Sequence, residues 1–66
     1  MTNELNKLNK SQRKSLRALF GGRRALSVVV DEAISFVTID FGAVTHFVVL
    51  GPRGRIEEHN FQPTYC

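Results

Sequence analysis

The sequence predicts an α+β protein in which one N-terminal amphipathic helix packs on a three- to four-stranded antiparallel β-meander. Three observations predict this fold class. Apolar residues recur at helical spacing over 3–20, the composition changes to β-branched and aromatic residues after Arg24, and very short turns separate the strand-like runs that follow. Connections this short join antiparallel neighbours, because a parallel crossover needs a dozen or more residues.

A helix is expected over 3–20. Its apolar residues form one stripe about 120° wide, and its basic residues form an arc of about the same width on the opposite side. Gln12 is the single polar residue on the stripe. The stripe consists of Leu5, Leu8, Leu16, Leu19 and Phe20. This separation predicts that the stripe builds the core and that the basic arc faces outward.

The ends of this helix carry suitable capping residues. Asn3 or Thr2 can serve as N-cap, and Glu4 suits the positive end of the helix dipole. The glycines at 21–22 can adopt positive φ and stop the helix. Ser11 is also a good N-cap, so a shorter helix that starts there is an alternative.

Four strand-like runs follow, over 26–30, 35–41, 44–50 and 55–61. The expected turns are 31–33, 42–43 and 51–54. The last is the strongest turn signal, because Pro52 fixes its own φ and the glycines on either side tolerate unusual dihedral angles. The whole chain, 1–66, is expected to form a single small domain with a meander over 26–61 and a C-terminal tail over 62–66.

The third run is apolar at both odd and even positions and should therefore be a central strand. One helix can cover only one face of the sheet. The other face would leave valines and phenylalanines in water unless something covers it. A partner, a second copy of the chain or the segment 61–65 could do so.

Length and composition favour a folded, cytoplasmic protein. With 66 residues, of which 42% are hydrophobic and 23% charged, the chain resembles an ordinary small globular domain. No run approaches the roughly 18 apolar residues that a membrane-spanning helix requires, and the polar N-terminus is unlike a signal peptide. The lone Cys66 cannot form an internal disulfide, which fits a reducing compartment, although an exposed terminal thiol could link two copies.

Charge is distributed unevenly along the chain. Residues 1–24 contain seven basic residues and one acidic residue, a charge of +6, whereas the remainder contains two basic and five acidic residues, a charge of −3. Such a molecule attracts anionic partners through one end. The candidate binding residues are Lys7, Lys10, Arg13, Lys14, Arg17, Arg23 and Arg24.

The two histidines are the only side chains whose predicted arrangement suggests a metal site or a catalytic site. If 51–54 is a four-residue loop, Leu50 faces Arg55 and His46 lies directly opposite His59. Asp40 or Cys66 could complete a zinc site, and Asp40 could pair with a histidine for general base catalysis. The spacing matches no standard ligand pattern, and a slip of one residue moves Asp40 to the other face. We therefore expect no metal and treat both histidines as structural.

No catalytic motif is present in the sequence. It contains no glycine-rich phosphate loop, no nucleophile elbow and no Cys-x-x-Cys, and the 51–54 turn lacks the Lys-Ser or Lys-Thr of a P-loop. A chain of this size also has little volume for an enclosed pocket. We expect a binding protein that is not an enzyme and needs no cofactor.

The basic arc favours nucleic acid as the partner, because it contains no acidic residue, whereas a merely solvated surface usually mixes both signs. The contacts would be mainly to phosphates, since neither a helix-turn-helix nor a zinc-finger pattern is present. The sheet lacks the paired aromatic signature of an RNA-recognition motif. One of Phe36, Phe41, Phe47 and Phe61 could still stack on a base, although core packing is expected for most of them.

The alternative is a protein partner. An acidic protein could dock on the helix or on the sheet, and many small proteins of phages and other mobile elements act as stoichiometric inhibitors of larger enzymes. A homodimer through the uncovered face or an edge strand is a further possibility. Binding to a membrane surface is not expected, because the apolar stripe is needed for the core.

Overall fold

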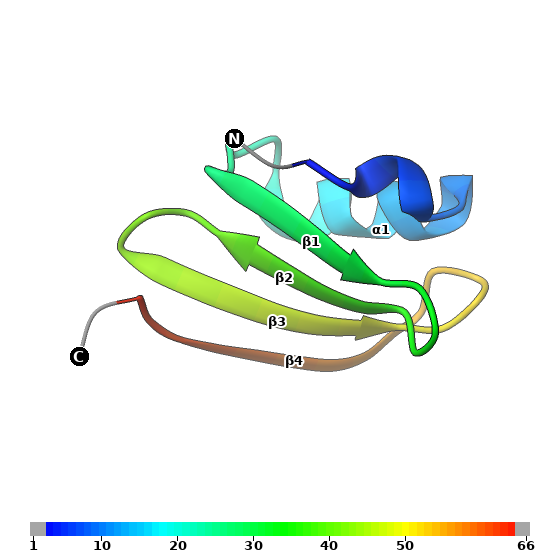
Figure 1. Cartoon of the computed structure of the whole chain (residues 1–66). Coiled ribbons are helices and arrows are strands. Elements are labelled where there is room, and N and C mark those ends of the chain that lie inside the picture. Colours follow the sequence, from blue (N-terminus) through cyan, green and yellow to red (C-terminus); the bar gives the residue numbers. More distant parts are fainter. Residues whose placement is uncertain (1–2, 65–66) are drawn as a thin grey trace.

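The computed structural model describes residues 3–64, and Thr2, Tyr65 and Cys66 therefore lie outside the described residues. A short 3₁₀ turn, η1 (Leu5–Lys7), precedes one helix, α1 (Lys10–Phe20). Four strands follow in the order β1-β2-β3-β4, and every neighbouring pair is antiparallel. The strands are β1 (Ser27–Asp31), β2 (Phe36–Asp40), β3 (Val44–Leu50) and β4 (Ile56–Pro63). The predicted α+β meander is confirmed (Figure 1).

The prediction of one continuous helix over 3–20 is wrong, because the chain leaves the helical conformation at Leu8. Asn9, and not Asn3, is the N-cap of α1. Its side-chain oxygen accepts from the Gln12 N–H at 2.9 Å, and the Gln12 side chain accepts from the Asn9 N–H at 3.0 Å. This reciprocal capping box begins the helix at Lys10, close to the alternative start at Ser11. The predicted stop is confirmed, since Gly21 has φ 59°.

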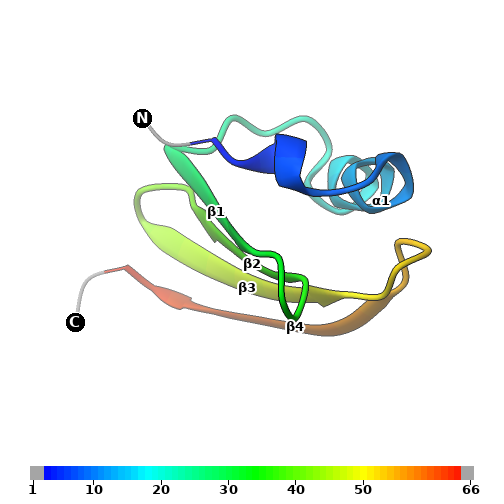
Figure 2. The same cartoon turned by 45° about the vertical axis from the view of Figure 1, so that its right-hand side comes forward.

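The core lies between one face of the sheet and the helical layer, which consists of α1 and the segment that precedes it. Figures 1 and 2 show η1 and α1 on the same side of the sheet. Leu8 and Leu16 come from the N-terminal part, and alternate positions of β1, β2 and β3 supply the rest. Val37 and Val48 are completely buried. The buried core residues are Leu8, Leu16, Val28, Val30, Val37, Ile39, Val48 and Leu50.

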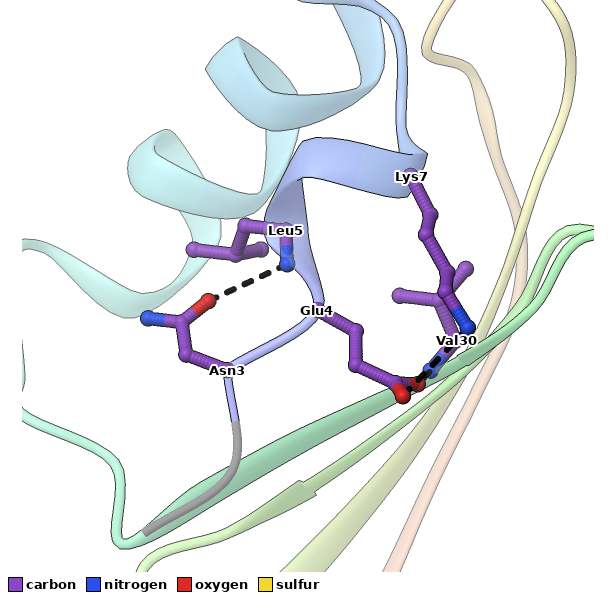
Figure 3. A network of polar contacts seen from close by, with 5 residues as sticks. All are labelled: Asn3, Glu4, Leu5, Lys7 and Val30. Atoms are coloured by element: carbon purple, nitrogen blue, oxygen red, sulfur yellow. Dashed lines mark hydrogen bonds and ion pairs between the residues drawn. The ribbon is translucent and has the colours of Figure 1, made fainter.

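The N-terminal segment covers the outer edge of β1. The Glu4 N–H donates to the Val28 carbonyl at 3.0 Å, and the Val30 N–H donates to a carboxylate oxygen of Glu4 at 2.8 Å. Figure 3 shows the Glu4 carboxylate lying between Val30 and Lys7, whose Nζ is 3.3 Å from the second oxygen. The hydrogen bond from Val30 lowers the pKa of Glu4, partial burial opposes that change, and Lys7 adds a smaller lowering effect.

The turn between β3 and β4 packs against the start of α1. The Gly51 N–H donates to the Arg55 carbonyl at 2.7 Å, and the Gly54 N–H donates to the Gly51 carbonyl at 3.0 Å. The Asn9 side-chain amide donates to the Pro52 carbonyl at 2.8 Å. The third predicted turn is therefore confirmed, and it also anchors the helix to the sheet.

Strand β4 runs two residues further than predicted. The predicted tail over 62–66 begins inside this strand, because Gln62 pairs with Thr45 and Pro63 pairs with Val44. The Thr64 N–H donates to the Ala43 carbonyl at 3.0 Å and continues the same ladder. Residues 61–64 therefore extend the edge of the sheet and do not fold over its second face.

Candidate nucleic-acid interface

All seven basic residues predicted as binding residues are exposed. Four of them lie in α1, and each is three and four residues away from two of the others, which places all four on one side of the helix. These four side chains border a common shallow hollow on the surface. We call them the basic arc of α1: Lys10, Arg13, Lys14 and Arg17.

Lys7 is separate from this arc. It lies in η1, on the far side of the break at Leu8, and its ammonium pairs with Glu4. Among residues 3–64 this is the one ion pair that forms. The side chains of the basic arc thus have no carboxylate partner within the described part of the chain.

Arg23 and Arg24 extend the positive charge beyond the C-terminal end of α1. The Arg23 guanidinium carbon lies 4.2 Å from the centre of the Phe41 ring, which is cation–π geometry. Phe41 in turn packs against Phe20, with ring centres 5.2 Å apart. An aromatic pair therefore fixes one guanidinium at the surface.

A groove of about 460 Å³ lies between these arginines and the sheet. Its floor is apolar and comes from η1, α1, the segment after α1, β1, β2 and the residue after β2. Arg13 and Arg17 border it from the helix, and Arg23 and Arg24 border it from the segment after the helix. The floor residues are Leu5, Leu16, Phe20, Ala25, Val28, Ile39 and Phe41.

The structure adds Arg53 to the basic residues near α1. Its two neighbours in the turn both contact the helix start, because Pro52 accepts from Asn9 and Gly54 packs closely on Ser11. Arg53 is exposed. The sequence grouped it with the acidic C-terminal part, and the one signal for its position was the strong turn between β3 and β4.

The two histidines touch, but they are not directly opposite each other as predicted. Leu50 pairs with Ile56 and Val49 with Glu58, so a bulge shifts the register and places Phe61 opposite His46. His59 is a diagonal neighbour, and His46 Nδ1 lies 2.9 Å from His59 Nε2. The prediction of one shared face is thus correct although the register is wrong.

His46 also packs on aromatic rings. Its ring centre is 5.0 Å from that of Phe20 and 5.4 Å from that of Phe41, both in edge-on geometry. Burial lowers the pKa of His46 from its ordinary value, and the nearby His59 and Arg23 lower it further. The neutral form of His46 is therefore the one that fits the fold.

Asp40 does not join the histidines. Ile39 pairs with His46, so Asp40, the next residue along β2, points to the other face of the sheet. Its carboxylate accepts from the Gly42 N–H at 2.7 Å. Cys66, the other proposed ligand, lies outside the described residues. Within residues 3–64 no three His, Cys, Asp or Glu side chains come together as metal ligands do.

The second face of the sheet has a different character, and we call it the open face. Phe36 and Phe47 lie side by side there with ring centres 6.1 Å apart, and Val29 is 47% exposed. Asp31 and Glu58 end the cross-strand row that contains Phe36. The open face includes Val29, Phe36, Thr38, Phe47 and Val49 together with the carboxylates of Asp31, Asp40 and Glu58.

Carboxylates on the open face repel phosphates, so Phe36 and Phe47 are poorly placed to stack on nucleic acid. Phe41 is on the basic side of the molecule instead, and Phe61 lies near the histidines, 5.5 Å from the ring of His46.

Comparison of the chain with family models, curated proteins and solved structures found no match. In the described part of the chain no helix is long and apolar enough to cross a membrane.

Proposed function

We propose that this chain is a small, non-enzymatic nucleic-acid-binding protein that contacts phosphates through the basic arc of α1, extended by Arg23 and Arg24. One observation carries the proposal. The four basic side chains on one side of α1 are exposed, and among residues 3–64 none of them is neutralised by a carboxylate. Side chains in this state attract a polyanion and release its counterions on binding. The lone cysteine supports a reducing, cytoplasmic setting.

The apolar side of α1 supports the same proposal. Leu16 is buried in the core, and Gln12 is bound to the turn after β3. This packing holds the helix rigidly on the sheet with its basic arc outward. A rigid arc loses little conformational entropy when it meets a phosphate backbone.

Salt dependence tests the proposal directly. Labelled single- and double-stranded DNA and RNA are titrated with the protein at about 50 and 200 mM salt. If the four side chains of the basic arc each meet one phosphate, affinity falls roughly 100-fold across this interval. Absence of binding at the lower salt concentration contradicts the proposal.

Charge reversal locates the surface. The triple variant Arg13→Glu, Lys14→Glu and Arg17→Glu should lose binding while its unfolding midpoint stays close to that of the wild type, because all three side chains are exposed. Single variants supply a matched comparison. Arg17→Glu and Arg55→Glu make the same change in charge at exposed arginines, and only the first lies on the basic arc. Equal losses in both would show that net charge matters and that the arc does not.

The open face favours a second candidate function, a protein-binding modulator or stoichiometric inhibitor of the phage or mobile-element type. Phe36, Phe47 and the half-exposed Val29 form an apolar centre, and such centres are typical of protein interfaces. An acidic partner would meet α1, whereas the carboxylates of the open face suit a partner with basic residues.

A second copy of the chain could also bind the open face and form a homodimer. Sedimentation of the wild type and of Val29→Asp tests this homodimer. A concentration-dependent doubling of mass that the variant lacks supports it, and a monomer at every concentration excludes it.

A further inference from the structure

The groove beside α1 combines two features that a plain phosphate-binding surface does not need. Its rim is formed by Arg13, Arg17, Arg23 and Arg24, and its floor is apolar. Every basic side chain that lines the groove is an arginine, whereas Lys7, Lys10 and Lys14 all lie outside it. A guanidinium is planar and stacks on flat π systems, which an ammonium does not.

The dimensions and chemistry of the groove suit a nucleobase. Its volume of about 460 Å³ falls within the range of small-ligand pockets, roughly 300 to 1,000 Å³. The Phe41 ring belongs to the floor and holds the Arg23 guanidinium at 4.2 Å. A base that enters the groove can therefore stack on an aromatic or guanidinium plane while its own phosphates meet the remaining arginines.

We infer that this groove binds an unstacked base of single-stranded nucleic acid, so that the protein prefers single strands to duplex. The inference rests on the proposed function, and it names the form of nucleic acid. Bases in a duplex are paired and stacked, so a duplex brings its phosphates to the arginine rim and leaves the apolar floor unfilled. A single strand can fill both at once.

Three ligands of equal length separate base binding from phosphate binding at about 50 mM salt: a labelled 20-nucleotide oligothymidylate, a 20-nucleotide strand of abasic sites and a 20-base-pair duplex. The abasic strand keeps the phosphates and removes the bases. One stacked base is expected to give the oligothymidylate an advantage of about 10-fold over the abasic strand. Equal affinity for these two strands would overturn the inference and leave the phosphate-binding proposal standing.

Two matched double variants then locate the base. Arg23→Gln with Arg24→Gln removes two charges from the rim of the groove, and Lys10→Gln with Lys14→Gln removes two charges from α1 outside it. All four side chains are exposed, so both variants should fold. The lysine variant should weaken binding of every ligand by a similar factor and keep the advantage of oligothymidylate over the abasic strand. The arginine variant should reduce that advantage to near one.

If the arginine variant keeps the full advantage, the base binds elsewhere and the inference is wrong. If the wild type binds none of the three ligands, the proposed function itself fails, which is a different result from binding without a preference for bases. Circular dichroism and thermal unfolding of both variants confirm that each comparison is made between folded proteins.

Discussion

The Gln12 side-chain amide donates a hydrogen bond of 3.0 Å to the Gly51 carbonyl oxygen and thereby joins the start of α1 to the turn after β3. The same nitrogen lies 3.4 Å from the Ser35 hydroxyl, and the side-chain oxygen accepts from the Asn9 N–H. Gln12 is buried in the apolar stripe with its polar atoms satisfied. This hydrogen bonding explains why a glutamine occupies a position where the helical pattern expects an apolar residue.

Replacing Gln12 by alanine should destabilise the fold by about 1 to 3 kcal/mol, because the Gly51 carbonyl keeps only the Gly54 N–H as a donor and the Asn9 N–H loses its acceptor in the capping box. The measurement is the free energy of unfolding from urea denaturation. Ser11→Ala is the control, since it changes an exposed residue of the same helical turn and should alter stability by less than about 0.5 kcal/mol. Similar effects of the two variants would show that the buried hydrogen bond contributes nothing.

Gly54→Ala should be more destabilising than Gly22→Ala. Both glycines have positive φ, 87° and 80°, so alanine costs about 1 to 2 kcal/mol in strain at either position. A Cβ on Gly54 would also lie 2.5 Å from the Ser11 carbonyl oxygen, whereas a Cβ on Gly22 meets no atom within 4 Å. The turn must then move away from α1, which adds roughly 1 to 3 kcal/mol. Equal unfolding midpoints for the two variants would contradict this packing.

The sequence predicted the fold better than it predicted the ends of the elements. Alternation and short turns were sufficient for a four-stranded meander with β3 in the interior. The helix was predicted too long because Leu5 and Leu8 continue the spacing of Leu16 although Leu8 is extended, with ψ 151°. The spacing of apolar residues shows which residues share a face, but it does not show that the helix is continuous. Although the chain is not helical at Leu8, Leu5 and Leu8 both face the core. The capping box at Asn9 then decides where the helix begins.

For the candidate site too, some features could be predicted from the sequence and others could not. The exposure of the seven basic residues on and around α1 was predicted, because charge and helical period are local properties of the sequence, whereas the position of Arg53 was not. The groove was not predicted, since it requires Arg23 to lie on Phe41 and residues of α1 to line one space together with residues of β1 and β2. The offset between His46 and His59 was missed because a bulge between Val49 and Leu50 leaves no local signal. Contacts between distant segments set these features.

Leu16→Ala should destabilise the protein by about 2 to 4 kcal/mol, because Leu16 is 4% exposed and packs in the centre of the core. Leu19→Ala provides the comparison on the same helix. Leu19 is 37% exposed and should cost clearly less. Urea denaturation of both variants measures the difference. A larger loss at Leu19 would mean that α1 is rotated relative to the arrangement described above.

Stability should fall as the pH drops below about 6.5 because of His46. The fold lowers the pKa of His46 from 6.5, chiefly by burial, so the unfolded chain binds a proton more readily than the folded one. The stabilising contribution is complete above pH 6.5 and is lost as the pH falls through the lower value in the folded state. Glu4, whose pKa is lowered from 4.5, changes the stability only at pH values below those at which His46 titrates.

The unfolding midpoint in urea, measured at intervals from pH 8 to 5.5, tests this expectation. His46→Gln should flatten the profile over that range, because the titrating group is gone. His59→Gln should keep much of the decline, since burial of His46 is the main cause of its lowered pKa and His59 only adds to it. A profile that flattens in His59→Gln and persists in His46→Gln would assign the pH dependence to the other imidazole.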